Sequence, residues 1–198
     1  MKLLIIEGPD RCGKNTLITN LVTRTGCCVT RHFGKAEGET DEEKQLNQQK
    51  FFSREFALAS AKQREIFHMP GKEHENDLFI WNRGHLGEFV YGTLYRNTHP
   101  EDWVIQMEEA FEVEKDPEIY LLLLTAHPDF LVKKDDGLSF SSKVEDRIKE
   151  IEKFREACEK STIQHKLEIC VTEESENGEI RFRSDKDILN EVSKFIWE

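Results

Sequence analysis

The chain has 198 residues, a length that fits one domain with a sizeable core, and its formal net charge is −11. That charge argues against a protein that coats extended nucleic acid, because such a protein needs a basic face. Five cysteines without Cys-x-x-Cys spacing indicate free thiols in a reducing compartment. With no signal peptide and no apolar run near the roughly 20 residues of a membrane span, we expect a cytoplasmic protein without a membrane partner.

The first expected strand, residues 2–7, is apolar almost throughout, as a strand buried on both faces should be. It leads into a glycine-rich loop that precedes a helix expected over 14–24, and the loop reads Glu7-Gly8-Pro9-Asp10-Arg11-Cys12-Gly13-Lys14-Asn15-Thr16. A strand, a Gly-x4-Gly-Lys loop and a helix form the arrangement of P-loop proteins. Backbone N–H groups and the positive end of the helix would hold a phosphate, and Lys14 would reach the outer phosphates.

The position after Lys14 departs from the usual P-loop pattern, which has a serine or threonine that binds magnesium. Asn15 stands there instead, and its side-chain carbonyl is an oxygen that Mg²⁺ accepts directly or through water. Thr16 is a second candidate, one position later. Glu7, at the end of the first strand, would hold the metal through water or orient Arg11. We therefore name Asn15 and Glu7 as candidate metal ligands.

Strands and helices are expected to alternate along the rest of the chain. Thr40 and Glu43 have the spacing of a capping box, and Asn177-Gly178 favours the tip of a hairpin-like turn over 173–183, before Ser184 caps the last helix. The expected strands are 2–7, 27–33, 77–81, 118–125 and 166–172, and the expected helices are 14–24, 41–69, 86–95, 100–113, 128–133, 144–160 and 185–197. This order predicts a three-layer α/β fold, with a five-stranded parallel sheet flanked by helices, in a single domain over 1–198.

The glycine-rich loop resembles one family more closely than P-loop proteins at large. The pattern Glu7-Gly8-x-Asp10-Arg11-x-Gly13-Lys14-x-Thr16 resembles thymidylate kinases, and small phage-type deoxynucleoside monophosphate kinases look similar. Arg31-His32-Phe33-Gly34 resembles the family's Arg-Phe-Pro segment, and Trp81-Asn82-Arg83-Gly84-His85 its Asp-Arg-Tyr segment. The resemblance implies a P-loop kinase that uses ATP and Mg²⁺, takes small nucleotides as substrates with dTMP as acceptor, and forms a homodimer.

Phosphoryl transfer between two anions needs alignment and charge neutralisation more than a strong base, so cations should dominate the site. We expect Arg11, Lys14 and Arg83 to be catalytic, with Arg11 bridging the transferred group as the resemblance implies. Arg83, at the carboxyl end of a parallel strand, would bind the acceptor phosphate, or else form a salt bridge there. By the resemblance, Asp10 accepts a hydrogen bond from the acceptor's 3′-hydroxyl; the alternative is an ion pair with a local cation.

The residues expected around the two nucleotides follow from the same pattern. Donor contacts are expected from Gly8, Asp10, Arg11, Cys12, Gly13, Lys14, Asn15 and Thr16. A polar segment at 133–147 containing Gly137 would form a lid, whose Lys143 and Arg147 close on the donor phosphates; the alternative is a solvated loop. Acceptor contacts, besides Asp10 and Arg83, are expected from Phe33, Phe52, Phe56, Arg64, His85, Glu88 and Tyr91.

Several of these positions have a second interpretation. Phe51, Phe52 and Phe56 are also typical of a core, and His85 could cap a helix. The family's thymine-stacking Phe and thymine-reading Arg align with Ala59 and Gln63, and Asn82 replaces the aspartate of its Asp-Arg-Tyr segment. Two alternatives to a deoxynucleoside monophosphate kinase therefore stay open. One is a kinase acting on a deoxynucleoside or a hydroxymethylated pyrimidine, including one within DNA, and the other is a non-catalytic nucleotide-binding regulator.

Overall fold

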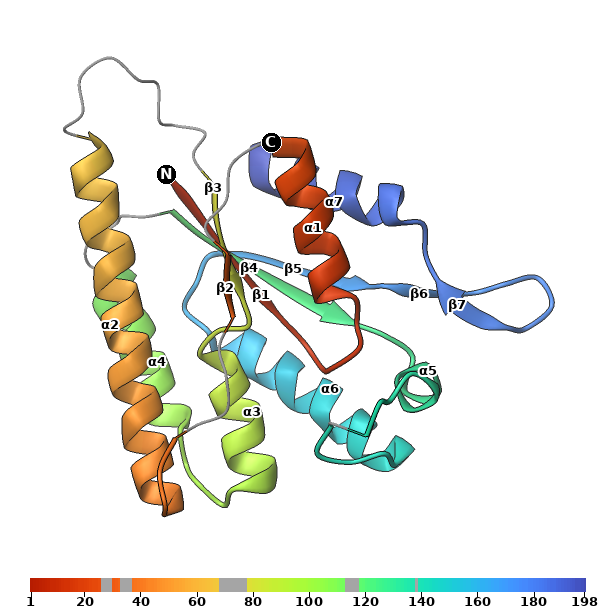
Figure 1. The fold of residues 1–198 in the computed structure, drawn as a ribbon, viewed down its shortest axis with the longest axis horizontal. Helices are drawn as coiled ribbons and strands as arrows, with labels where there is room; N and C mark the ends of the chain where they lie inside the picture. The colour runs from red at the N-terminus through yellow and green to blue at the C-terminus, as the bar shows by residue number, and fades with distance from the viewer. Residues whose placement is uncertain (26–29, 33–36, 68–77, 113–117, 138) are drawn as a thin grey trace.

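A computed structural model describes residues 1–25, 30–32, 37–67, 78–112, 118–137 and 139–198 (Figure 1). Five strands form one parallel sheet in the order β2-β3-β1-β4-β5. They are β1 (Lys2–Glu7), β2 (Thr30–His32), β3 (Leu78–Asn82), β4 (Glu118–Thr125) and β5 (His165–Cys170). The described helices are α1 (Lys14–Thr25), α2 (Asp41–Phe67), α3 (Leu86–Tyr95), α4 (Glu101–Glu112), α5 (Pro128–Lys133), α6 (Val144–Lys160) and α7 (Asp185–Trp197). The predicted three-layer α/β architecture is confirmed.

Helices cover both faces of the sheet because side chains alternate along its strands. In β1, Leu4 and Ile6 pack in one cluster with apolar residues of α1 and α7. Leu3 and Ile5 pack in a second cluster with residues of α2, α3 and α4. Figure 1 shows the same division, with α1 and α7 together on one face and α2, α3, α4 and α6 on the other. Among the described helices, none is both long and apolar enough to cross a bilayer.

Local signals set several element boundaries as predicted. The capping box is present at the start of α2, where Thr40 Oγ1 accepts from Glu43 N at 3.2 Å and the Glu43 carboxylate accepts from Thr40 N at 3.4 Å. Strand β4 and helices α5 and α6 have the predicted bounds. Ser184 is at the N-cap position of α7, but its side chain makes no capping hydrogen bond, so that part of the prediction is wrong.

The last predicted strand ends earlier than expected, because the chain changes its pairing partner at Val171. The N–H of Val171 still donates to Thr125 O at 2.8 Å, whereas its carbonyl accepts from Arg183 N at 2.8 Å. The chain then enters an antiparallel hairpin of β6 (Thr172–Glu174) and β7 (Ile180–Phe182). Gly178 at its tip has a φ of 79°, so the predicted hairpin is confirmed.

The order of the sheet brings two loops together at its carboxyl edge. Strand β1 pairs with β3 on one side and β4 on the other, and Ile6 lies opposite Asn82. Beyond that pair, Arg83 N donates to Ile6 O at 2.9 Å. The glycine-rich loop after β1 and the Arg83 segment after β3 are therefore neighbours, at the edge where open α/β sheets bind ligands.

Candidate active site

The glycine-rich loop has a backbone that only small residues permit at its first turn. Gly8 has a φ of 136°, and a Cβ there would lie 2.0 Å from Leu124 O. Gly13 has a φ of 76° and precedes the first residue of α1. The loop therefore approaches β4 closely and then presents the positive end of α1, which is how a loop of this kind holds a phosphate.

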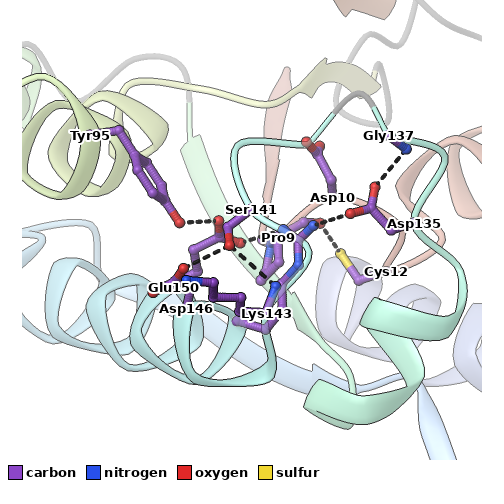
Figure 2. Close-up of polar contacts among 12 residues, drawn as sticks. Pro9, Asp10, Cys12, Tyr95, Asp135, Gly137, Ser141, Lys143, Asp146 and Glu150 are labelled. Atoms are coloured by element: carbon purple, nitrogen blue, oxygen red, sulfur yellow. Dashed lines mark hydrogen bonds and ion pairs between the residues drawn. The ribbon is translucent and has the colours of Figure 1, made fainter.

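Lys14 lies across the inside of this loop. Its ammonium donates to Gly8 O and Pro9 O, each at 2.7 Å, and its side chain is almost buried. Cys12 is fully buried, and its thiol also donates to Pro9 O, at 2.8 Å (Figure 2). The Cys12 side chain therefore points away from the cavity, as predicted, and burial raises the pKa of its thiol. Only the backbone of Cys12 is left to contact a nucleotide.

Arg11 and Arg83 share an unusual backbone conformation. Each has a φ of 70°, in the left-handed region where a residue with a Cβ is strained by about 1 kcal/mol. The guanidinium of Arg83 forms an ion pair with Asp10, and that of Arg11 forms one with Asp136. Burial opposes the charge on Arg83, but the charge and hydrogen bond of Asp10, together with Tyr91 and Glu7, outweigh burial and raise the pKa of Arg83. Both arginines thus place a charged guanidinium group in the space between the glycine-rich loop and the Arg83 segment.

Glu7 forms the floor between the two loops. Its Oε1 accepts from Gly84 N at 2.9 Å and from Gly87 N at 3.1 Å, so it connects the end of β1 to the start of α3. Glu7 is fully buried, and this burial raises the pKa of its carboxyl. Nearby, Asn82 Nδ2 donates to Asn15 Oδ1 at 2.6 Å. Within the described residues, no three His, Cys, Asp or Glu side chains form a metal cluster.

These groups line one cavity of about 910 Å³, which is bounded by the glycine-rich loop, α2, α3 and the connection between α5 and α6. Its wall carries six basic and four acidic side chains, although the chain as a whole has a net charge of −11. The basic ones are Arg11, Lys14, Lys44, Arg83, Arg96 and Lys134, and the acidic ones are Glu7, Asp10, Glu88 and Asp136. A basic cavity in an acidic protein suits anionic ligands.

Most of the residues predicted from the sequence meet in this cavity. Those that line it are Glu7, Gly8, Asp10, Arg11, Gly13, Lys14, Asn15, Thr16, Phe52, Arg83, Glu88 and Tyr91. Phe33 lies outside the described residues, and so does the side chain of Arg64. The remaining predicted residues do not line the cavity; they are Cys12, Phe56, His85, Lys143 and Arg147.

His85 and Phe56 belong to the core, contrary to the acceptor contact that we predicted for them. Both are fully buried, and their rings meet at a centroid distance of 5.1 Å. His85 Nε2 lies 2.5 Å from Glu108 Oε1, on α4. Although His85 is at the N-cap position of α3, its side chain makes no capping hydrogen bond. The position of His85, two residues after Arg83, did not indicate that Glu108, 23 residues further along the chain, holds the imidazole in the core.

The predicted lid residues also lie elsewhere. Arg147 is 1% exposed and pairs with Glu150 at 2.8 Å and with Asp135 at 3.4 Å, so it fixes the base of the α5–α6 connection. Lys143 is exposed on the outside, where its backbone N–H donates to Ser141 (Figure 2). The connection nevertheless reaches the cavity with different side chains, namely Lys134, Asp136, Ser139 and Phe140.

Sequence reasoning missed several residues that line the cavity. They are Lys44, Gln48, Arg96, Lys134, Phe140 and Phe182. Phe140 stacks on Tyr95 with a centroid distance of 4.7 Å and an interplanar angle of 7°. Phe182 reaches the glycine-rich loop from the β6–β7 hairpin, where a Cβ on Gly13 would lie 3.7 Å from its ring. Neither Arg96, eight residues after Glu88, nor Phe182 on the hairpin has a local sequence signal.

Solved structures share this fold, among them one from Bacillus subtilis and one from Candida albicans. The YorR protein of Bacillus subtilis, solved in complex with phosphorylated GDP, matches with a TM-score of 0.59 and 16% identity over 98% of this chain and 95% of that chain. The thymidylate kinase of Candida albicans matches with a TM-score of 0.60 and 16% identity over 98% of this chain and 90% of that chain. The chain therefore has a thymidylate-kinase-like P-loop fold. No protein-family profile matches the sequence, and no curated protein matches it.

Proposed function

We propose that the chain is a kinase that transfers the γ-phosphoryl group of ATP to the phosphate of a deoxynucleoside monophosphate, with dTMP as the expected acceptor. The observation that carries this proposal is the single cavity in which a glycine-rich loop with Lys14 and Arg11 faces a second arginine, Arg83. A protein that only holds one nucleotide needs the first set of cations. A second guanidinium beside it suits a second phosphate.

In this proposal the donor phosphates lie in the glycine-rich loop, which fits them by its backbone. The loop N–H groups and the α1 N-terminus hold the chain of phosphates, and the Lys14 ammonium moves from Gly8 O and Pro9 O to phosphate oxygens. An acceptor phosphate oxygen attacks the γ-phosphorus, the bond to the β–γ bridging oxygen breaks, and ADP and a nucleoside diphosphate result. Arg11 and Arg83 neutralise the equatorial oxygens during this transfer.

The oxygen donors near the loop fit Mg²⁺ as a partner of the phosphates. The Asn15 and Asn82 amides meet at the cavity wall, and Glu7 lies beneath them. Bound Mg²⁺ would neutralise charge on the phosphate oxygens, with Asn15 and Glu7 holding it directly or through water. A nearby cation would also favour the ionised form of Glu7, whose pKa burial otherwise raises. The Asn15 amide would thereby take the place of the serine or threonine hydroxyl that binds magnesium in the usual P-loop pattern.

The lid predicted over 133–147 includes the ends of α5 and α6 and the connection between them, and Gly137 in this connection, with a φ of 78°, supplies a backbone position suited to a bend. For the homodimer, α2 exposes Leu46, Phe51 and Leu58, which are apolar side chains that support an interface on that helix. Light scattering on the purified chain tests the dimer. The YorR protein was solved with phosphorylated GDP, which supports a purine nucleotide as a ligand of this fold.

Incubation with ATP, Mg²⁺ and a panel of deoxynucleosides and their monophosphates tests the activity, with ADP release as the readout. We expect turnover with monophosphates only. Turnover confined to deoxynucleosides, or to a hydroxymethylated pyrimidine supplied free or within DNA in a parallel assay, would replace the proposed acceptor. ATP binding without turnover on any acceptor would instead indicate a nucleotide-binding regulator.

A further inference from the structure

Glu88, on α3, and Arg96, directly after α3, form an ion pair in the wall of the cavity. Arg96 donates from its guanidinium to Glu88 Oε2 at 2.6 Å, and each side chain is 14% exposed. Both residues line the cavity. A pair this far from water gives up most of its hydration, so it adds little stability compared with apolar residues of similar size. Its presence in a cavity wall therefore points to a ligand.

Two polar atoms, one on Tyr91 and one on Arg96 itself, lack a hydrogen-bond partner within the described residues. The Tyr91 hydroxyl, on a side chain that lines the cavity and belongs to a residue 8% exposed, has no hydrogen-bond partner within the described part of the chain. The same is true of Arg96 Nε. Buried polar atoms are almost always bonded, so these two indicate groups that a ligand would satisfy.

The direction of α3 places this pair at the end of the cavity where a base would lie. The helix begins three residues after Arg83, and Arg96 follows its last residue, about 15 Å along the axis from Leu86. A nucleotide whose phosphate binds Arg83 therefore extends its sugar and base along α3. Glu88, Tyr91 one turn further along, and Arg96, which is bonded to Glu88, all line the cavity there.

We propose that Glu88 and Arg96 read the base of the acceptor nucleotide and select bases that carry a ring N–H next to an exocyclic carbonyl. This inference rests on the proposed function and deepens it. Thymine (N3–H and O4) and guanine (N1–H and O6) have this edge. The Glu88 carboxylate accepts from the ring N–H, and the Arg96 guanidinium donates to the carbonyl.

The other two bases present the reverse edge. Cytosine and adenine carry an exocyclic amino group next to an unprotonated ring nitrogen. Bound in the same place, they direct the amino group at Arg96, which has only donors, and a nitrogen lone pair at Glu88, which has only acceptors when ionised. Each mismatch leaves a buried polar group without a partner, so the pair discriminates by what it repels as well as by what it binds.

Initial rates with dTMP, dGMP, dIMP, dCMP and dAMP test this selection. We expect kcat/KM to be roughly 10- to 100-fold higher for the first three than for dCMP and dAMP. dIMP carries the ring N–H and the carbonyl without the 2-amino group, so it separates this edge from recognition of guanine as a whole. Equal rates on all five monophosphates would overturn base reading by the pair. No turnover on any monophosphate would overturn the proposed function itself.

Two variants assign the selection to these side chains. Glu88→Gln and Arg96→Gln should each reduce the preference for dTMP over dCMP to within about threefold, mainly through KM for dTMP, while the KM for ATP stays unchanged. Glu173→Gln, in an exposed pair with Arg181 on the hairpin, is the matched control and should keep the full preference. Melting temperatures report whether each variant is folded. A folded Glu88→Gln or Arg96→Gln variant that keeps the preference would contradict the inference.

Discussion

Glu7 and Glu108 are both buried carboxylates, but their surroundings differ. Glu7 is at the floor of the cavity, and its carboxylate accepts from two backbone N–H groups, of Gly84 and Gly87. Glu108 is on α4, where it is buried in the protein core and hydrogen-bonded to His85, Ser161 and Thr162. Burial raises the pKa of the Glu7 carboxyl. Burial acts in the same direction on Glu108, but the hydrogen bonds from His85, Thr162 and Ser161 outweigh it, so the pKa of Glu108 is lowered.

The difference separates a group that holds the fold together from one that is held ready for a ligand. Glu108 is fully compensated by protein donors and should stabilise the folded state. Glu7 is under-compensated in the protein alone, which is the condition of a group that awaits a cation. We therefore expect changes around Glu7 to affect turnover, and changes around Glu108 to affect stability.

The largest effect should come from Arg83→Gly, on the cavity side. Loss of the guanidinium should lower kcat about 1,000-fold, because a charge-stabilising donor is removed from the transferred group. Glycine also relieves the left-handed backbone at φ 70°, so the free energy of unfolding should change by no more than about 1 kcal/mol. ADP release and urea unfolding measure the two quantities. Arg155→Gln, in an exposed pair with Glu168, should leave both unchanged, and an active Arg83→Gly variant would remove Arg83 from the site.

Glu108→Gln should produce the opposite result. We expect the free energy of unfolding to fall by about 3 kcal/mol, because a buried carboxylate that is hydrogen-bonded to His85, Ser161 and Thr162 is replaced by a neutral amide. The kcat of the folded fraction should stay within about twofold. Urea unfolding with parallel rate measurements tests both. A large loss of kcat at unchanged stability would mean that the His85–Glu108 pair acts on the site.

The stability that Glu108 contributes should depend on pH in a defined direction. The pKa of Glu108 is lower in the folded chain than in the unfolded one, so the contribution is complete above the unfolded pKa of about 4.3. It is lost as the pH falls through the folded pKa. The difference in unfolding free energy between the original chain and Glu108→Gln should therefore be largest near pH 7 and shrink below about pH 4. A constant difference across this range would argue against an ionised Glu108.

Glu7→Gln should have a smaller effect, again on turnover. The amide keeps an oxygen for Gly84 N and Gly87 N but removes the charge, so kcat should fall about tenfold if Glu7 supports the metal. Because the pKa of Glu7 is raised in the folded chain, its ionisation at pH 7 opposes folding. The variant should thus be as stable as the original chain or more stable by about 1 kcal/mol. Loss of stability at pH 7 would contradict this reasoning.

The smallest effect should come from the lid. Phe140 is 55% exposed and stacks on Tyr95, and such stacked pairs contribute about 1 kcal/mol. Phe140→Ala should raise the KM for nucleotide about fivefold and lower the melting temperature by about 2–4 °C, because the stack on Tyr95 is lost. Phe140→Tyr keeps the ring and serves as the control, so equal KM values for the two variants would rule out a role for stacking.

The fold could be predicted from the sequence because its signals are local. The apolar run at 2–7, the glycines at 8 and 13, and the proline at 128 each fix a turn or a boundary within a few residues. The central part of the site could be predicted from the sequence for the same reason, because Lys14, Arg11 and Arg83 lie in the segments that follow strand ends.

The parts that sequence reasoning missed depend on the orientation of helix faces and on contacts between distant segments. Arg147 has the charge expected of a lid residue, but its place on α6 directs it inward to Glu150 and Asp135. Arg96 has no motif around it, and only the packing of α3 brings it into the cavity. Phe182 reaches the glycine-rich loop because the chain changes its hydrogen-bonding partner at Val171, from the end of β4 to the segment after β7, and so enters the hairpin.

The ion pairs of Arg11 with Asp136 and of Arg83 with Asp10 have a consequence for product release. A phosphate that binds these arginines displaces a carboxylate, so binding exchanges one anion for another. In the proposed reaction, the same carboxylates would return to the guanidinium groups when the diphosphate product leaves. Neither arginine has to face the cavity as an uncompensated charge, which keeps the site from retaining its product through electrostatic attraction alone.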